Sequence, residues 1–489
     1  MLFNSHIFIL LFLPLLLAGW YFLNWKKKFQ LAQGYLIGMS LWFYAYANLQ
    51  YLWLLLFSCL IGWLLRCLPE KILSEKGKKV LTGIGCVFHL GLLGYFKYSN
   101  FFLENLNTVF HTDFPMLQIL LPVGISFYTF QQLAYLIDRC RGDAPRDSLF
   151  DYLTFMVYFP QLLQGPILLR SEFMGQLKEP ERRRFHAERF SEGIQFFVFG
   201  LAKKVLLADT LAKAVNYGYS NVSMLDSISA LLLAVGYLTE LYFDFSGYCD
   251  MAVGLGKMIG LEVAENFDAP FHSASVKEFW RRWHMTLGRF FTRYVYIPLG
   301  GNRKGKMGTL CNVMIVMLLS GLWHGAAWTF VLWGFLHGVG MIWDNLEHPH
   351  LPKKWMRQAA TFAYVCMTFV FFRAESIAQG VDVLKSIVSL KWNGFVFQMA
   401  SALDLTEFYM ITKALSMKLP GLLSWFWLGI FVVLIAICFR VLSGEKVSGV
   451  VALQRQKGYG RLYPVLLAVL FTWSMISMTG VSEYLYFSF

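Results

Sequence analysis

The sequence predicts an all-α polytopic membrane protein, and three observations lead to that prediction. Of the 489 residues, 57% are hydrophobic and only 15% are charged, and the mean hydropathy is +0.50, whereas soluble proteins average roughly 45–50% apolar and about 25% charged residues. Lysine and arginine outnumber aspartate and glutamate by 43 to 30, and aromatic residues make up 18% of the chain. The excess positive charge lies in short segments between long apolar runs, as in multi-span membrane proteins. These observations exclude an ordinary soluble enzyme.

The apolar runs indicate where the chain crosses the bilayer. A helix needs about 20 apolar residues to span a hydrocarbon core of about 30 Å, because lipid offers backbone polar groups no hydrogen-bond partner. The runs of this kind are 5–24, 32–48, 49–66, 80–96, 117–137, 192–208, 226–246, 308–323, 325–343, 358–372, 421–439 and 462–481. A further run at 150–169 is interrupted by proline and glycine. We expect about 10 to 12 transmembrane helices, re-entrant and interfacial helices beside them, and no soluble domain.

Basic loops give the expected orientation, because such loops stay on the cytoplasmic side. The basic clusters lie at 26–28, 71–79, 182–184, 277–306 and 440–461. Both termini are then expected to be extracytoplasmic, and the connection 97–116, which lacks a basic bias, is expected outside as well. The first run is expected to be a retained span and not a signal peptide, since its positive cluster follows it.

The segment 262–306 differs from the rest of the chain in its charge. From residue 266 onwards it carries eight lysines and arginines against Asp268 and Glu278, interleaved with aromatic residues. A basic, aromatic helix lying in the membrane interface is one interpretation. The other is that its cations bind an anionic, phosphate-bearing substrate, with Gly300 and Gly301 allowing close backbone approach. The candidate substrate-binding residues are Arg281, Arg282, Arg289, Arg303, Lys304 and, from the segment that follows, Trp323.

Two histidines are the candidate catalytic residues, His284 and His324. Basic residues on both sides of 308–343 predict that this segment leaves the cytoplasmic face and returns as two short helices. The break at Ser320, Gly321 and Gly325 then places His324 inside the protein. An ionisable side chain at membrane depth is costly and predicts a functional site, with a hydrogen-bonded structural histidine as the alternative.

The other histidines and the cysteines predict no metal site. On a continuous helix His337 would lie about 20 Å along the axis from His324, which is too far to share a metal or a catalytic dyad, and we expect it to be structural. The eight cysteines never form a CxxC pair, so neither a zinc site nor a disulfide framework is expected. We also expect no bound cofactor and no nucleic-acid partner.

The chain ends in the aromatic segment YLYFSF, residues 484–489. A terminus is normally polar and frayed, so four aromatic residues in six positions predict that this segment docks, either into an external cavity of the protein or into the headgroup region. An interfacial aromatic belt is the alternative interpretation.

Five motifs in order closely resemble the membrane-bound O-acyltransferase (MBOAT) family, and within it the bacterial branch of alginate O-acetyltransferase-like proteins. They are LPVGISFYTFQ (121–131), YFPQLLQGPI (158–167), YFDFSGYCDMAVGLGKM (242–258), EFWRRWHMTLGRFFTRYVYIPLGGNRKG (278–305) and SGLWHGAAWTFVLWGFLHG (320–338). The resemblance implies one MBOAT domain over 1–489, with N-terminal spans in 1–116, a catalytic core in 117–345 and C-terminal spans in 346–489. It also implies that His324 of the WHG motif is catalytic and that His284 of the RRWH motif is the second histidine.

The ending YLYFSF resembles the aromatic acyl-transfer motif of cell-envelope acylating systems, which makes Tyr486 the candidate acyl relay. Tyr484 stands where that motif is expected to have phenylalanine. The resemblance implies an acetyltransferase of the bacterial cytoplasmic membrane that uses acetyl-CoA as donor. It would pass the acetyl group to a serine of an extracytoplasmic SGNH-type acyltransferase, for O-acetylation of alginate, cellulose, peptidoglycan or another polysaccharide.

Histidine suits this reaction, because its ordinary pKa near 6.5 lets it take a proton from a hydroxyl and return it to a leaving thiolate. Tyr486 would carry the acyl group as a phenyl ester, and His284 would line the thioester channel or stabilise the developing charge. Two alternatives stay open. One is a D-alanyl transferase of the teichoic-acid type, and the other is a membrane transporter, which would predict an internal repeat that we do not find.

Overall fold

The computed structural model describes most of the chain. The described residues are 1–47, 49–67, 74–143, 147–346, 352–442, 446–457, 460, 462–478 and 485. Within them the secondary structure is helical, without a strand, which confirms the all-α class. Five of the described helices are long and apolar enough to cross a membrane: Phe8–Trp25, Glu75–Phe110, Ser227–Ile259, Gly305–His324 and Pro420–Val441. A multi-pass membrane protein is thereby confirmed, and the count of about 10 to 12 spans stays a prediction.

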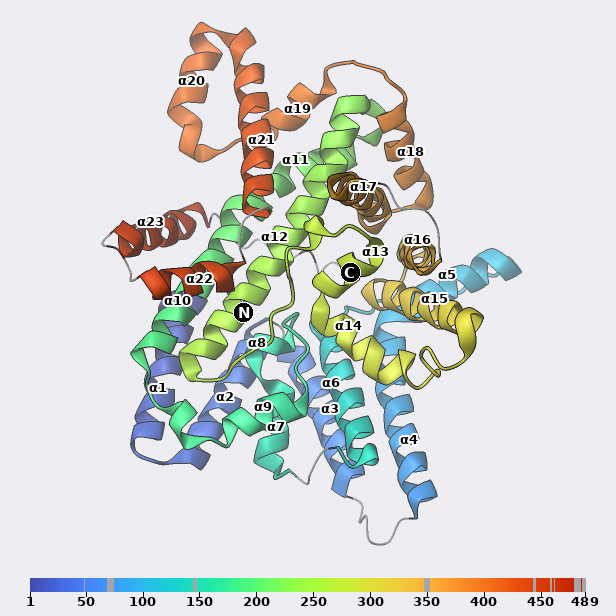
Figure 1. Cartoon of the computed structure of the whole chain (residues 1–489), viewed down its shortest axis with the longest axis vertical. Helices are drawn as coiled ribbons and strands as arrows, with labels where there is room; N and C mark the ends of the chain where they lie inside the picture. Colours follow the sequence, from blue (N-terminus) through green and yellow to red (C-terminus); the bar gives the residue numbers. More distant parts are fainter. Residues whose placement is uncertain are drawn as a thin grey trace.

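The N-terminal helices gather at one end of the molecule (Figure 1). They begin with a π-helical segment, Phe8–Phe12, and continue as α1 (Leu13–Trp25), α2 (Phe29–Ala47), α3 (Leu49–Cys67) and α4 (Glu75–Leu93). The next helices are α5 (Ser99–Phe110), α6 (Ile125–Arg141), α7 (Leu149–Val157), α8 (Phe159–Leu162) and α9 (Arg170–Leu177). The interrupted run at 150–169 is thus a pair of short helices, as its proline and glycine predict.

Two expectations for this part of the chain are wrong. The segment 97–116 is not simply a connection, because α4 continues through the π-helical segment Gly94–Tyr98 into α5 and stays helical as far as Phe110. The run 117–137 becomes helical only at Ile125, since Pro122 and Gly124, which has a φ of +78°, interrupt it. The predicted run 80–96 ends before the charged residue Lys97, but the helix continues through Lys97.

The helix α12 runs through the middle of the molecule (Figure 1). It covers Ser227–Ile259 and is longer than the predicted span 226–246. It packs against α10 (Ala187–Ala202), the π-helical segment Lys203–Ala208 and α11 (Asp209–Ser220). The contact with α10 is close because glycines face each other: a Cβ on Gly200 would lie 2.5 Å from the carbonyl oxygen of Gly247. Small residues of this kind allow two membrane helices to approach closely.

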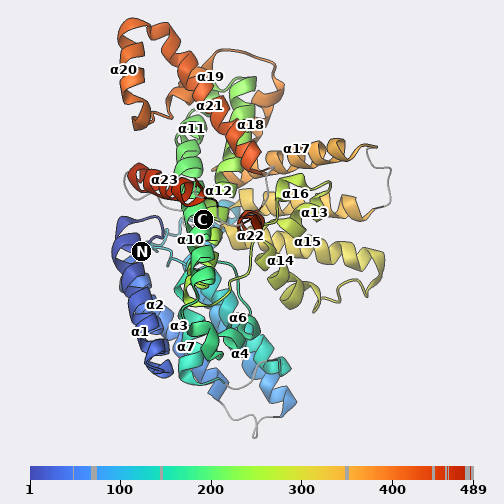
Figure 2. The same cartoon turned by 60° about the vertical axis from the view of Figure 1, so that its left-hand side comes forward.

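The later helices lie on the other sides of α12. Short helices α13 (Val276–Arg282) and α14 (Met285–Phe291) precede α15 (Gly305–His324), α16 (Trp328–Asn345) and α17 (Lys354–Arg373). Figure 2 shows α15, α16 and α17 side by side, projecting from α12. The two short helices predicted at 308–323 and 325–343 are confirmed, and the chain reverses at 325–327 between them.

The last group of helices begins at the end of α12 that is remote from the N-terminal helices (Figure 1). It consists of α18 (Ile377–Val388), α19 (Phe395–Ser401), α20 (Tyr409–Lys418), α21 (Pro420–Leu442), α22 (Val447–Lys457) and α23 (Leu462–Ser477). The helices α22 and α23 return to pack against α10. Two buried apolar clusters meet around residues 323 and 324: one includes Trp323, and the other includes Trp333 and Phe372.

Candidate active site

His324 is the last residue of α15 and lies deep inside the protein. The residue is only 3% exposed, and Gly325 follows it in extended conformation, which ends the helix. Aromatic rings surround the imidazole: the ring centroids of Trp323, Trp333 and Phe372 lie 5.0, 5.1 and 5.2 Å from its own. The prediction that His324 is inside the protein is confirmed.

His284 lies next to His324, although α14 and nearly all of α15 separate the two residues in the chain. The centroids of the two imidazole rings are 6.3 Å apart. His284 is fully buried and joins α13 to α14 with a φ of 45°, which is the left-handed region that non-glycine residues rarely adopt. Such strained backbone persists only where its surroundings enforce it, and it is common at functional sites.

Asn266 holds His284 in place, a role that no motif in the sequence indicates. The amide oxygen of Asn266 accepts hydrogen bonds from the backbone N–H and the hydroxyl of Thr286, at 3.1 and 2.9 Å. Nδ1 of His284 faces the same oxygen at 3.3 Å. Because an amide oxygen can only accept, this contact assigns the proton of His284 to Nδ1 and the lone pair to Nε2.

Lys97 is a second residue that sequence reasoning missed, and it caps the helix that ends at His324. Its amino group donates to the carbonyl oxygens of Trp323 and His324, at 2.7 and 2.9 Å, and faces the hydroxyl of Ser126 at 3.4 Å. The neighbouring Tyr98 hydroxyl donates to the carbonyl of Leu322 at 2.6 Å. Consecutive residues of one π-helical segment therefore satisfy the last three carbonyl groups of α15, which have no partner within their own helix.

The predicted substrate-binding residues fall into three groups. Arg282 pairs with Glu278 at 2.9 Å, and Arg289 pairs with Glu172 at 2.5 Å, so the charges of both arginines are balanced within the protein. Trp323 is buried and stacks on Phe130. The other three cations are exposed and form no ion pair with the residues that the structure describes: Arg281, Arg303 and Lys304.

His337 is fully buried and both of its ring nitrogens have partners. The indole N–H of Trp280 donates to Nδ1 at 3.2 Å, and Nε2 lies 2.9 Å from the hydroxyl of Thr368. These contacts agree with the expected structural role. The expected separation of about 20 Å is wrong, because the ring of Trp333 lies 5.1 Å from His324 and 4.7 Å from His337, which leaves the two imidazoles at most about 10 Å apart. The chain reversal at 325–327 brings them together.

The candidate relay Tyr486 lies outside the described residues, as does Tyr484. Between them, Leu485 is described. It packs, half-buried, against the apolar cluster that includes Trp333 and Phe372. Its backbone N–H donates to Oδ2 of Asp244 on α12 at 3.2 Å. This contact places Leu485 against the protein, and docking of the aromatic residues themselves stays a prediction.

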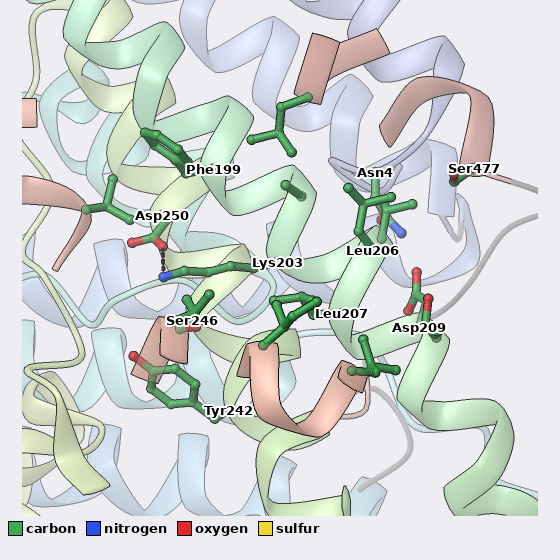
Figure 3. A pocket seen from close by; sticks show the side chains of 18 of the residues that line it. Asn4, Phe199, Lys203, Leu206, Leu207, Asp209, Tyr242, Ser246, Asp250 and Ser477 are labelled. Atoms are coloured by element: carbon green, nitrogen blue, oxygen red, sulfur yellow. Dashed lines mark hydrogen bonds and ion pairs between the residues drawn. The ribbon is translucent and has the colours of Figure 1, made fainter. Parts of the chain in front are cut away.

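A cavity of about 970 Å³ lies between α10, α12, α21 and α23. Figure 3 shows its interior, where Lys203 pairs with Asp250 at 2.6 Å and Tyr242 and Ser246 lie close by. The cavity wall is mostly apolar and includes Asn266, so the cavity borders the residue that holds His284. Sites for small molecules commonly have this size and this kind of lining.

The described cysteines and acidic residues form neither a disulfide nor a group of metal ligands. The seven cysteines whose thiols are described are free. Among the described residues, no three histidine, cysteine, aspartate or glutamate side chains are grouped to hold a metal ion.

Comparison with known proteins identifies similar chains. The model of the membrane-bound O-acyltransferase family matches residues 142–379, a range that includes both His284 and His324. The chain is 35% identical over 423 residues to the peptidoglycan O-acetyltransferase of Helicobacter pylori, covering 80% of each chain. It is 40% identical over 389 residues to the probable alginate O-acetylase AlgI of Azotobacter vinelandii, covering 77% of this chain and 76% of that one. The teichoic acid D-alanyltransferase of Streptococcus thermophilus is more distant, at 28% over 253 residues, covering 49% and 58%.

Proposed function

Because the chain belongs to the membrane-bound O-acyltransferase family and is an acyltransferase, we propose that it moves an acetyl group from cytoplasmic acetyl-CoA to an extracytoplasmic acceptor. One relative is named for peptidoglycan and another for alginate. We therefore propose O-acetylation of a cell-envelope polysaccharide or exopolysaccharide, with alginate, cellulose and peptidoglycan as candidates. The observation that carries the proposal is the buried pair His284 and His324, with ring centroids 6.3 Å apart.

In the proposed reaction His324 is the general base and acid. It takes the proton from the hydroxyl of Tyr486 while the tyrosine oxygen attacks the thioester carbonyl carbon. The carbon–sulfur bond then breaks, and the coenzyme A thiolate takes the proton back from His324. The products are O-acetyl-Tyr486 and coenzyme A. A serine hydroxyl of a separate extracytoplasmic SGNH-type acyltransferase takes the acetyl group from this phenyl ester and regenerates the tyrosine.

His284 has a supporting role in this proposal. Asn266 fixes the orientation of its ring, and the ring lies beside His324, where it stabilises charge that develops on the thioester or lines the channel for it. Arg281, Arg303 and Lys304 are proposed to bind the phosphates of the donor. These residues are exposed and form no ion pair within the described part of the chain, so their charges are available to an anionic ligand.

The proposed location is the bacterial cytoplasmic membrane, with both termini extracytoplasmic. The distribution of basic clusters supports this orientation. The cavity that borders Asn266 is also lined by Arg440 and Lys446, which belong to a basic cluster expected on the cytoplasmic side. An entry for the acyl donor from the cytoplasm agrees with that arrangement.

The two alternatives have less support. The D-alanyltransferase relative is 28% identical and aligns over 49% of the chain, whereas the two O-acetylase relatives align over 80% and 77%. All three relatives are named as acyl-transferring proteins, and none is named as a transporter.

The proposal is tested by incubating the purified protein with radiolabelled acetyl-CoA and no partner, and measuring label bound covalently to the protein. We expect label on the wild type and none on His324→Ala or Tyr486→Phe, with both variants folded. Labelling from a D-alanyl carrier protein in place of acetyl-CoA would favour the D-alanyl alternative. A wild type that neither binds label nor releases coenzyme A would contradict the proposal.

A further inference from the structure

A buried ionic cluster lies where the C-terminal segment meets α12. Nζ of Lys204 lies 2.6 Å from Oδ1 of Asp244 and 2.8 Å from Oδ1 of Asp209. The side chains of Lys204 and Asp244 are 2% and 1% exposed. Burying charges is costly even when they are paired, so such a cluster is weak evidence for stability and can serve to fix geometry instead.

Asp244 uses its two oxygens for two different purposes. Oδ1 accepts from Lys204, and Oδ2 accepts the backbone N–H of Leu485 at 3.2 Å. The lysine restrains the carboxylate, which presents its second oxygen to the C-terminal segment. A hydrogen bond to a backbone N–H holds Leu485 in place whatever its side chain.

The side chain of Leu485 adds a second attachment. It packs against the apolar cluster that contains Phe330, Trp333 and Phe372, and the rings of Trp333 and Phe372 also lie beside His324. The polar and the apolar contact of Leu485 thus tie this residue to α12 and to the apolar cluster whose Trp333 and Phe372 lie beside His324. The residue that follows Leu485 in the chain is Tyr486.

We propose that Asp244 is a positioning residue that anchors the C-terminal segment at Leu485 and so sets the register in which Tyr486 is acylated. Lys204 and Asp209 hold the carboxylate for this purpose. The part that concerns acylation rests on the proposed function, whereas the anchoring of the segment does not.

The chain contains a matched control for this cluster. Lys203, the preceding residue, pairs with Asp250 on the same helix α12 at 2.6 Å, and both side chains are largely buried. Figure 3 shows this pair in the wall of the cavity. Asp244→Asn and Asp250→Asn each remove one buried carboxylate next to a lysine, but only Asp244 contacts Leu485. A general loss of folding would therefore affect both variants.

A second pair of variants changes Leu485, whose backbone N–H is the hydrogen-bond donor, and leaves the ionic cluster intact. Leu485→Pro removes the backbone N–H, because proline has none. Leu485→Met keeps both the N–H and the apolar volume. All variants are made in the full-length chain in lipid nanodiscs. Anchoring is measured as the rate at which a carboxypeptidase trims the C-terminus, followed by intact mass, and acylation as label on Tyr486 from radiolabelled acetyl-CoA.

Asparagine at 244 has one acceptor oxygen for two donors, Lys204 and the Leu485 N–H, and its NH2 group cannot accept. We therefore expect Asp244→Asn and Leu485→Pro each to lose one charge-assisted hydrogen bond, to be trimmed about 10-fold to 100-fold faster than the wild type, and to lose label on Tyr486 by a similar factor. The double variant should be trimmed no faster than either single variant, since both substitutions remove the same hydrogen bond between Asp244 and Leu485. Leu485→Met should stay within about 3-fold of the wild type in both measurements, and Asp250→Asn should do so in the trimming measurement, for which it is the control.

Equal trimming of Asp244→Asn and Asp250→Asn would overturn the anchoring. Faster trimming with undiminished label on Tyr486 would overturn the positioning role. A wild-type segment that resists trimming but never takes label would contradict the proposed relay, and the trimming rates would still decide whether Asp244 anchors the segment.

Discussion

Replacing Lys97 by methionine separates positioning of His324 from stability of the fold. Methionine keeps the length and the apolar stem of the side chain but removes the amino group that donates to the carbonyls of Trp323 and His324 at 2.7 and 2.9 Å. Three acceptor oxygens surround this amino group, matching the three donors of an ammonium. No carboxylate of the described residues lies within ion-pair distance of it.

The two consequences of Lys97→Met differ in size. Two hydrogen bonds from a charged group contribute about 1.5–3 kcal/mol each to stability. A buried charge without a counter-charge costs several kcal/mol, so the two effects nearly cancel and the melting temperature should change by no more than about 5 °C. The last turn of α15 loses its cap, however, and a displacement of about 1 Å at a catalytic group costs on the order of 100-fold in rate, or about 2.7 kcal/mol in activation free energy.

The assay is the initial rate of coenzyme A release over a range of acetyl-CoA concentrations, with the extracytoplasmic partner present to regenerate Tyr486. We expect kcat to fall and KM to change little, because Lys97 acts on the backbone of His324 and not on the donor. Tyr98→Phe is the matched control: it removes one neutral hydrogen bond to Leu322 in the same turn and should cost less than about 10-fold. A Lys97→Met variant that keeps its rate within about 3-fold of the wild type, or that fails to fold, would refute this reasoning.

Three further changes test other parts of the structure. Asn266→Leu should lower kcat by about 10-fold without unfolding the protein, because His284 loses the acceptor that orients it; steady-state kinetics with acetyl-CoA would reveal this, and unchanged kcat would argue against it. Thr368→Val should lower stability by about 1–3 kcal/mol and leave kcat unchanged, since the lost hydroxyl bonds His337 and the Val365 carbonyl and neither His284 nor His324; thermal unfolding measures the change. Gly200→Val should prevent close packing of α10 on α12 and abolish folded protein in gel filtration, whereas a folded variant would contradict the role of this glycine.

The local features of the fold could be predicted from the sequence. The helices α15 and α16 were expected at 308–323 and 325–343 and are found at Gly305–His324 and Trp328–Asn345. Their bounds depend on nearby glycines and flanking charges, which are visible along the chain. The family and the two motif histidines were also predictable, because the matching motifs are long and occur in order.

The partners of these histidines could not be predicted, since they come from distant parts of the chain. Asn266 and Lys97 become important only when the fold brings them to His284 and His324. Lys97 was expected in the connection 97–116, because the apolar run 80–96 ends before it. The helix in fact continues through this charged residue. Asp244 could have been found: it is an ionisable residue in a predicted span, and the rule that singled out His324 applies to it equally.

The π-helical segment Gly94–Tyr98 makes the candidate active site sensitive to insertions and deletions far from the motifs. A π turn holds one residue more than an α turn, and each residue rotates a helix by about 100°. Deleting any single residue between α4 and α5 would restore an ordinary helix and turn either Lys97 or all of α5 away from its present contacts. The length of this segment is therefore under the same constraint as the identity of Lys97, and homologous chains should exchange residues here far more readily than they gain or lose one.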